Sequence, residues 1–427
     1  MTRAVRLGAA AVALAVIATG WAIRRASGGL GTATPPFVPG WSPNIDLVGA
    51  AIAVVVLVAA VALAPRLLDR RLPAVAFSAA SYVLALCVGL AANLARDGTD
   101  GWSRMFTIGE GAFHEGPNEY LPGLPTLGYG VRFYLDRFAE MATSQPVNVA
   151  GHPPGPLLLM DALGITTAGG LAALCIVAGA LCAPLAHRLG WTLDDEPTGR
   201  IAGLLCALSP AFVLFGVSSY DVVFAAIGAL AACLLVARGP GWRLAGVVVF
   251  AIATLMSWAL LAIGAWAAIV AWRREGWRAA IVLAVACGIA VLVLDGALAL
   301  ATGYDPIGAL AATKQVYDNS LATRRPYAFW VFGSPVAWGV MTGVPIIAAA
   351  IAGLVARRPA AIALAVVVLV AALGGFTKAE TERIWLFMVP LACVAAAPWL
   401  RTARLRPVLA LLAAQILVVE LLYETVW

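Results

Sequence analysis

Long apolar blocks, separated by short loops that carry arginine, recur along the whole chain and leave few folds open to it. A helix needs about 20 apolar residues to cross the hydrocarbon core of a bilayer, and blocks of that length repeat here. Charged residues make up 12% of the chain and hydrophobic residues 62%, so charge is at roughly half the level of an ordinary soluble domain. The sequence therefore predicts an all-α polytopic membrane protein, folded as a single membrane-embedded domain over residues 1–427.

We predict about 13 transmembrane helices, within a range of about 11 to 13. The predicted spans lie near residues 7–23, 44–65, 74–95, 162–184, 200–217, 221–237, 279–300, 335–356, 359–376, 384–400 and 407–423, with two more inside 244–272. Residues 244–272 are too long for one crossing, and the break at Ser257-Trp258 divides them into two short helices. Merging this pair would reverse the orientation of every later segment.

Short arginine-rich loops set the predicted orientation, because cytoplasmic loops carry an excess of basic residues. This rule places the N-terminus in the cytoplasm and two longer segments, 96–155 and 301–334, on the external face of a plasma (inner) membrane. Arg24 and Arg25 follow the first span where a signal peptide would have small residues, so this span is predicted to be a retained anchor. The loop arginines also explain the net charge of +6, and no nucleic-acid partner is predicted.

The segment from Asp97 to Pro156 is the longest polar stretch of the chain, and any chemistry is expected there. It ends in the sequence GHPPGP at residues 151–156, where the chain re-enters the membrane. Prolines commonly begin helices, which is a sufficient structural reason for them. His152 is different, because an imidazole at a membrane interface can hydrogen-bond a phosphate or a sugar hydroxyl.

About thirty residues upstream of this motif, Glu119-Tyr120 supplies a carboxylate. A carboxylate that faces a membrane-held electrophile suits general-base catalysis at a sugar hydroxyl. Loop carboxylates are usually no more than solvated charge, however, and Asp97 and Asp100, just past the third span, compete for the same role.

Candidate phosphate ligands lie in two other segments that are predicted to be external. In the turn from Lys378 to Trp385, Lys378 or Arg383 could bind a lipid phosphate, a guanidinium with two parallel hydrogen bonds. The competing interpretation is a self-neutralised interfacial loop with Trp385 as its aromatic anchor. Arg324 and Arg325 offer the same phosphate-binding chemistry.

The span near 221–237 begins with a further acid. Ser209-Pro210 is followed eleven residues later by Asp221. Either Ser219 or Asp221 can simply cap this helix, because its first N–H groups need an acceptor. A substrate-binding role is the alternative.

The order of these features resembles the GT-C superfamily of polytopic glycosyltransferases, in particular the protein O-mannosyltransferase-like and aminoarabinose-transferase-like branch. The likeness covers roughly residues 97–275: an external acidic loop, GHPPGP at the start of a span, Ser209-Pro210 with Asp221 downstream, and paired short spans. The chain departs from the family pattern in two ways. It lacks an Asp-Glu pair soon after the first span, and two extra spans precede its polar loop.

The resemblance implies an inverting transferase that moves a pentose or hexose from a polyprenyl-phosphate donor to an envelope polysaccharide or glycolipid on the external face. The implied base is Glu119, with Asp100 and Asp97 as alternatives. The implied donor-phosphate ligands are Arg383, Lys378, Arg324, Arg325 and His152, and the implied substrate-binding residues are Tyr120, Asp221 and Glu382. No cofactor or metal site is predicted, because fixed cations can stabilise a leaving phosphate, although Mg²⁺ or Mn²⁺ is compatible with this chemistry.

Two other functional classes stay open on the sequence. A transporter or lipid flippase would show repeated halves and broken helices that meet near the membrane midplane. A non-catalytic scaffold of an envelope-synthesis complex would leave the acidic loop without a lipid phosphate nearby.

Overall fold

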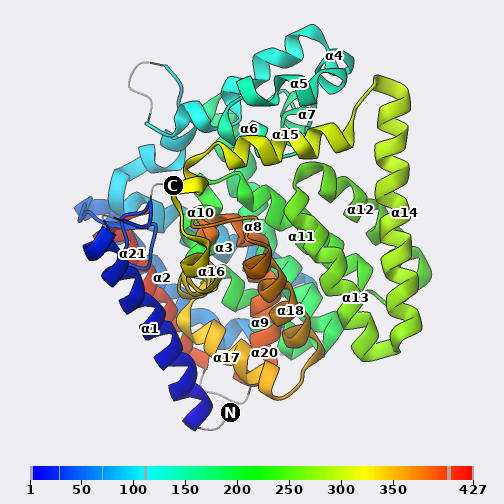
Figure 1. Cartoon of the computed structure of the whole chain (residues 1–427). Helices are drawn as coiled ribbons and strands as arrows, with labels where there is room; N and C mark the ends of the chain where they lie inside the picture. Colours follow the sequence, from blue (N-terminus) through cyan, green and yellow to red (C-terminus); the bar gives the residue numbers. More distant parts are fainter. Residues whose placement is uncertain (1–2, 28, 70, 110–112, 402–404, 426–427) are drawn as a thin grey trace. The chain divides into compact units, whose positions relative to one another are not determined.

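Helices dominate the computed structural model, which describes residues 3–27, 29–69, 71–109, 113–401 and 405–425 (Figure 1). Within these ranges the strands are limited to one short antiparallel pair, β1 (Gly40–Trp41) with β2 (Tyr423–Glu424). The predicted all-α class is therefore confirmed.

Six helices in the described part of the chain are long and apolar enough to cross a membrane. They are α1 (Arg3–Ser27), α2 (Leu47–Leu67), α3 (Ala74–Asp97), α8 (Ala168–Leu193), α14 (Trp277–Thr302) and α21 (Leu405–Leu422). Two bent pairs raise the number to eight if each pair is one span: α9 (Glu196–Ala207) with α10 (Pro210–Ser218), and α16 (Tyr327–Thr342) with α17 (Val344–Val355). The chain is a multi-pass membrane protein.

Several of the predicted spans form helices that are shorter than a full crossing. These are α11 (Asp221–Leu235), α12 (Pro240–Met256), α18 (Pro359–Gly374) and α20 (Val389–Leu400), which follows the 3-10 turn η8 (Leu386–Met388). Glycines at positive φ set one end of two of these helices. Gly239, at φ 107°, precedes the start of α12, and Gly375, at φ 60°, follows the end of α18. An apolar run shows that a segment is buried or lipid-facing, but such turns decide how long its helix is.

The chain divides into two compact units, each built from separate stretches of sequence. The first unit comprises Met1–Gly101, Cys175–Ala229 and Arg324–Trp427, and the second comprises Trp102–Leu174 and Leu230–Thr323. The sequence predicts one domain, since every block is apolar, and sequence pattern alone gives no signal for this division.

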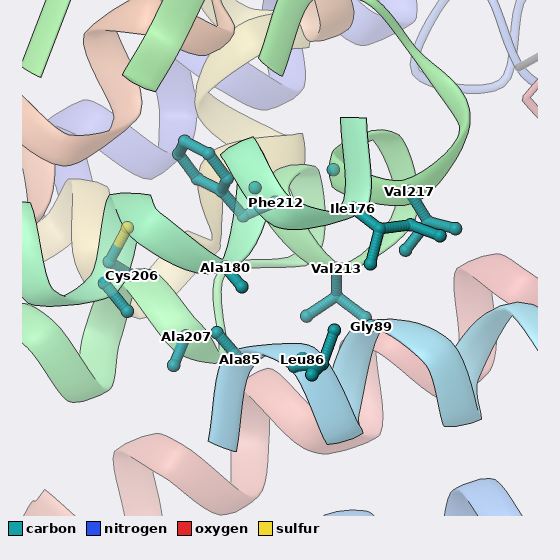
Figure 2. Close-up of a pocket in the computed structure, with 13 residues that line it drawn as sticks. Ala85, Leu86, Gly89, Ile176, Ala180, Cys206, Ala207, Phe212, Val213 and Val217 are labelled. Carbon is teal, nitrogen blue, oxygen red and sulfur yellow. The ribbon is translucent and has the colours of Figure 1, made fainter. Parts of the chain in front are cut away.

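Small residues let the helices of the first unit approach closely. A Cβ atom at Gly49 in α2 would lie 2.0 Å from the carbonyl oxygen of Leu94 in α3, and one at Gly179 in α8 would lie 2.5 Å from that of Gly216 in α10. Such contacts are typical of helix interfaces in membranes. The apolar pocket between α3, α8, α9 and α10 has a volume of only about 20 Å³ (Figure 2), which is too small for a substrate.

The breaks of the two bent pairs meet inside the first unit. The Ser209 hydroxyl, at the break between α9 and α10, donates to the Thr342 carbonyl at 2.7 Å, beside the break between α16 and α17. The Gln415 side chain of α21 donates to the Val340 carbonyl and accepts from the Val344 N–H. Side chains thus satisfy backbone groups that the helix breaks expose, as buried backbone requires.

A helical hairpin in the second unit confirms the predicted break at Ser257-Trp258. α12 ends at Met256, the 3-10 turn η6 (Trp258–Leu260) follows, and α13 (Leu261–Glu275) runs back. Gly264 of α13 lies against the Phe250 ring of α12, where a Cβ atom would be 2.7 Å from the ring. Arg243 and Glu275 form an ion pair between the two outer ends. Both ends of the hairpin therefore lie on one side, at its base.

The polar segment folds into short helical elements in the second unit. They are η2 (Arg104–Phe106), η3 (Gly116–Asn118), η4 (Leu121–Tyr129), α4 (Val131–Asp136), α5 (Phe138–Met141), η5 (Ala142–Ser144), α6 (Val147–Ala150) and α7 (Gly155–Ala162). α15 (Pro306–Asp318), from the second segment that is predicted to be external, packs against α5, η5 and α6 (Figure 1). The Thr313 hydroxyl donates to the Ala150 carbonyl at 3.0 Å.

This contact bears on the predicted topology, because residues 150 and 313 must lie on the same side of any membrane. An even number of crossings between them is required. Six of the predicted spans lie between residues 150 and 313 when the α12–α13 hairpin counts as two of them, and six is an even number. Which side this is stays a prediction from the loop arginines.

Candidate functional site

A buried carboxylate lies in the polar segment of the second unit. Glu119 follows η3 directly, and its own N–H donates to the Gly116 carbonyl at 3.1 Å. The residue is only 1% exposed. The side-chain amide of Asn148, in α6, donates to Glu119 Oε1 at 2.9 Å. This hydrogen bond from the Asn148 amide holds the Glu119 carboxylate in one orientation.

Asn148 also connects this carboxylate to His152. Its backbone carbonyl lies 2.7 Å from Nδ1 of His152, and the Tyr120 hydroxyl lies 3.1 Å from the same nitrogen. Because a carbonyl oxygen can only accept, Nδ1 carries the proton, and the lone pair of the neutral ring is on Nε2. Glu119, Tyr120, Asn148 and His152 are called the Glu119 cluster below.

The GHPPGP motif begins a helix, as its prolines predict. α7 starts at Gly155 with Pro156 in its first turn. A Cβ atom at Gly155 would lie 2.3 Å from the Leu255 carbonyl oxygen near the end of α12. The helix-starting interpretation is therefore confirmed, but the motif does not start the span itself, because α7 ends at Ala162 and the long apolar helix α8 begins only at Ala168. In addition, His152 contributes to the Glu119 cluster.

A second cluster, in the first unit, surrounds Arg383. The guanidinium of Arg383 forms ion pairs with Asp221 and Glu380, and the side chains of Arg383 and Asp221 are 8% and 5% exposed. The Ser219 hydroxyl donates to the Asp221 carboxylate at 2.8 Å and lies 3.2 Å from the Asp221 N–H. Ser219 therefore takes the capping role at the start of α11, while Asp221 pairs with the buried arginine.

Arg325 holds the turn that precedes α19 (Thr381–Ile384). Its guanidinium donates to the Lys378 carbonyl and to Glu380 Oε1, both at 2.7 Å. Between these two anchors Ala379 and Glu380 have φ angles of 65° and 58°, a conformation that is strained for residues with a Cβ atom. The arginine thus stabilises a local backbone conformation that the sequence disfavours.

Glu382 is the third acid of this cluster, and its side chain is almost completely buried. Its Oε1 accepts the Val38 N–H at 3.3 Å, while Oε2 has no hydrogen-bond partner in the described ranges. Burial raises the pKa of Glu382 to about 7. Burial also opposes ionisation of Glu380, but Arg325 and Arg383 outweigh it and lower the pKa of that residue. Asp221, Arg325, Lys378, Glu380, Glu382 and Arg383 are called the Arg383 cluster.

The structure brings most of the candidate residues together in two groups. The Arg383 cluster unites Asp221, Lys378, Arg325, Glu382 and Arg383, and the Glu119 cluster unites Glu119, Tyr120 and His152. The remaining candidates lie elsewhere in the first unit: Asp97 accepts from the Asn44 amide at 3.3 Å, and Asp100 and Arg324 are exposed. Among the three candidate bases, Glu119 is the most buried.

The turn from Lys378 to Trp385 is neutralised only in part by its own residues. Arg383 pairs with Glu380 inside the turn, but Arg325 and Asp221, from other segments, also pair with these two residues. The interfacial anchor is wrong: Trp385 is 2% exposed, and its indole N–H donates to the Thr377 hydroxyl at 2.9 Å. It packs against Trp338, with ring centroids 6.3 Å apart.

Asn148 is the residue of the Glu119 cluster that sequence reasoning missed, as Glu380 is for the Arg383 cluster. Asn148 is one polar residue among many in its segment. The only signal in the sequence is its position, four residues before His152. In the described part of the chain, no three His, Cys, Asp or Glu side chains are grouped as ligands for a metal ion. Comparisons with protein-family models, curated proteins and solved structures found no match.

Proposed function

We propose that this chain is an inverting glycosyltransferase of the GT-C type that takes a sugar from a polyprenyl-phosphate donor. The proposal includes about thirteen crossings of the plasma (inner) membrane and an active site on its external face, with an envelope polysaccharide or glycolipid as acceptor. Its main support is the buried Glu119 carboxylate, oriented by Asn148 in a polar segment between apolar helices.

In this proposal Glu119 accepts the proton of an acceptor hydroxyl. The hydroxyl oxygen attacks the anomeric carbon from the face opposite the phosphate, so a new C–O bond forms as the bond to the phosphate oxygen breaks. The configuration inverts, and the polyprenyl phosphate leaves with the bonding electrons. A carboxylate fixed by Asn148 needs little reorganisation to take the proton, which lowers the barrier.

Cations must stabilise the charge that develops on the leaving phosphate. Arg325 and Arg383 already have carboxylate partners, so we assign them to holding the turn that carries Lys378. In this proposal Lys378 and the exposed Arg324 bind the donor phosphate. His152 and Tyr120 position the polar segment around Glu119 and contact the substrate, and Asp221 and Glu382 act by fixing the Arg383 cluster.

The test is transfer from a radiolabelled polyprenyl-phosphate sugar by the purified full chain in lipid nanodiscs. E119Q keeps the shape of the side chain and can still pair with Asn148, but it loses the basic oxygen. We expect its kcat to fall by at least about a hundredfold. D97N and D100N are the matched controls and should stay within about threefold of the parent; a parent-like E119Q would refute the assignment.

A membrane transporter is the second candidate, and one observation favours it. The helix breaks at Ser209 and Thr342 meet inside the first unit, and discontinuous helices that meet are typical of secondary transporters. Uptake of a labelled lipid-linked sugar into proteoliposomes, without product formation, would favour this function. S209A should then impair uptake, whereas an enzyme should lose stability but keep its ratio of kcat to KM.

A further inference from the structure

Residues 29–38, between α1 and β1, pack over α16 in the first unit and are called the lid below. Leu30 and Phe37 are completely buried and share one apolar cluster with residues of α16. The Phe37 ring lies edge-on to Phe329 and Trp330, with ring centroids 5.2 and 5.7 Å apart. Burial of these apolar side chains anchors the lid, and Phe37 is the larger of the two anchors.

The lid covers one side of the Arg383 cluster. A Cβ atom at Gly31 would lie 3.3 Å from the Cγ atom of Arg325, so the lid backbone lies directly against that side chain. Ala379, in the strained turn, belongs to the same apolar cluster as the two anchors of the lid. At the end of the lid, the Val38 N–H donates to Glu382 Oε1 at 3.3 Å. The lid thus contacts both a cation and an acid of the Arg383 cluster.

One hydrogen bond joins the lid to the rest of the described chain, and it is the bond from Val38 to Glu382. The other hydrogen bonds of the lid are internal. The Thr34 N–H donates to the Phe37 carbonyl at 2.6 Å, and the Thr34 hydroxyl donates to the Thr32 carbonyl at 3.1 Å. Segments with few hydrogen bonds to their surroundings open locally at a low free energy. The bond from Val38 to Glu382 is therefore the latch of the lid.

The closed lid also contains backbone strain. Thr34 and Phe37 have φ angles of 86° and 85°, which are unfavourable for residues with a Cβ atom and most of all for a β-branched one. The buried Thr32 hydroxyl has no hydrogen-bond partner in the described ranges, and this adds to the cost of closure. The apolar anchors and the latch must offset both costs, so the loss of either shifts the lid toward an open form.

The charged groups around the latch all belong to the Arg383 cluster. Glu380 opposes the ionisation of Glu382 and Arg325 favours it, while Arg383 is paired with Asp221 and Glu380. The lid contains no charged residue, and neither do α10, α16 and η8, the elements that pack against α19. Burial outweighs Arg325 and raises the pKa of Glu382 to about 7. An open lid would hydrate this carboxylate, so its pKa would return toward the ordinary value of 4.5.

We propose that the lid closes over the Arg383 cluster when Glu382 binds a proton and opens when Glu382 loses it. While Glu382 holds the proton, the neutral carboxyl stays buried and accepts the Val38 N–H. When the proton passes to water, the lid moves away from Arg325 and Glu382, and water hydrates the carboxylate. The lid is thus a pH-dependent cover of the cluster. This inference does not depend on the glycosyltransferase proposal, because its test follows the lid and not sugar transfer.

The experiment is hydrogen–deuterium exchange of the full chain in lipid nanodiscs, read by mass spectrometry at several pH values and corrected for the pH dependence of chemical exchange. The open and closed lids differ by one bound proton between the two pKa values of Glu382. Protection of the lid should therefore fall about tenfold per pH unit up to a pH of about 7 and level off above it. E382Q keeps an oxygen for the Val38 N–H but cannot titrate, so its lid protection should stay constant within about twofold. E424Q is the matched control, because it removes a carboxylate from β2, beside the strand that follows the lid, and it should keep the slope of the parent.

Three results would overturn the proposal. The first is a parent-like slope in E382Q, since another group would then control the lid. The second is lid protection equal to that of the buried amides of α2, because the lid would then open only when the whole unit unfolds; we expect the lid to exchange at least about a hundredfold faster. The third concerns F37A, which serves if E382Q fails to fold. Without its larger anchor the lid should lose protection at least about tenfold at every pH while keeping the slope of the parent, and parent-like protection in F37A would show that Phe37 does not hold the lid closed.

Discussion

Two buried arginines, one at each polar end of the first unit, have different surroundings. Arg200 lies near the start of α9, and Arg383 pairs with Asp221, which follows α10, so the bent pair α9–α10 separates them. Arg200 is 2% exposed, and it donates to Glu196 and to the backbone carbonyls of Leu67, Asp69 and Leu72. It closes the end of α2, where carbonyls lack helical partners.

Arg383 forms its ion pairs with the side chains of Asp221 and Glu380. It pairs with two carboxylates, and a third, Glu382, lies beside it in the sequence with a raised pKa. The backbone next to it is in a left-handed conformation at Ala379 and Glu380. Arg200 thus satisfies fixed backbone groups, a purely structural task, whereas the Arg383 cluster concentrates charge and strain, which are typical of functional sites.

The largest effect is expected from R200M, which removes every one of those hydrogen bonds. Glu196 and three carbonyls would lose a buried partner, so the free energy of unfolding should fall by about 3–5 kcal/mol. Thermal unfolding in detergent, followed by tryptophan fluorescence, measures this. R200K keeps the charge and should recover part of the loss; a parent-like R200M would show that water replaces the guanidinium at this end.

R383M should cost less stability, about 2–3 kcal/mol, because both of its acids keep another partner. Asp221 retains the Ser219 hydroxyl, and Glu380 retains Arg325. Adding D221N to R383M removes the uncompensated carboxylate and should restore about half of the loss, measured in the same unfolding experiment. If the double variant is less stable than R383M, the loss of stability in R383M comes from packing and not from an unpaired Asp221 carboxylate.

Glu382 should make the stability of the Arg383 end depend on pH. Its carboxyl has an ordinary pKa of 4.5 in the unfolded chain and one of about 7 when folded. Between these values the folded chain holds a proton that the unfolded chain has lost, so stability is fully present below about pH 4.5 and declines as the pH rises toward 7. The decline is on the order of 3 kcal/mol.

E382Q should remove this decline and raise the Tm at pH 8, measured as Tm against pH between 4 and 8. E380Q is the matched control. Because the pKa of Glu380 is lowered, its own contribution is lost only as the pH falls below its ordinary value. The negative charge of Glu380 helps to raise the pKa of Glu382, so E380Q should keep the decline but move its upper end to a lower pH. An unchanged slope in E382Q would assign the titration to another group.

Sequence reasoning identified those features that depend on local pattern. The apolar blocks predicted an all-α membrane protein, and the polar break at Ser257-Trp258 predicted the two halves of the hairpin. It also selected Glu119 and His152, about thirty residues apart, which Asn148 connects in the structure.

Features that depend on contacts between distant segments were not predictable in this way. The pair Arg383–Asp221 joins residues 162 positions apart, and sequence spacing carries no information about such a contact. Trp385 illustrates the same limit. A tryptophan next to a polar turn fits an interfacial anchor, and only the packing of α16 shows that Trp338 covers it.

The smallest effect is expected at an exposed arginine of the Arg200 end. Arg401 pairs with Asp195, which caps α9 through the Thr198 N–H, and the two side chains are 42% and 44% exposed. R401Q should change the free energy of unfolding by less than about 1 kcal/mol, because water screens an exposed pair. Thermal unfolding at low and high salt checks this, and the difference from the parent should shrink as salt rises. A loss of stability as large as that of R200M would mean that the Arg200 end depends on the total charge of its side chains. The two ends would then not differ in the way proposed, with Arg200 bonded to backbone carbonyls and Arg383 to a cluster of charged side chains.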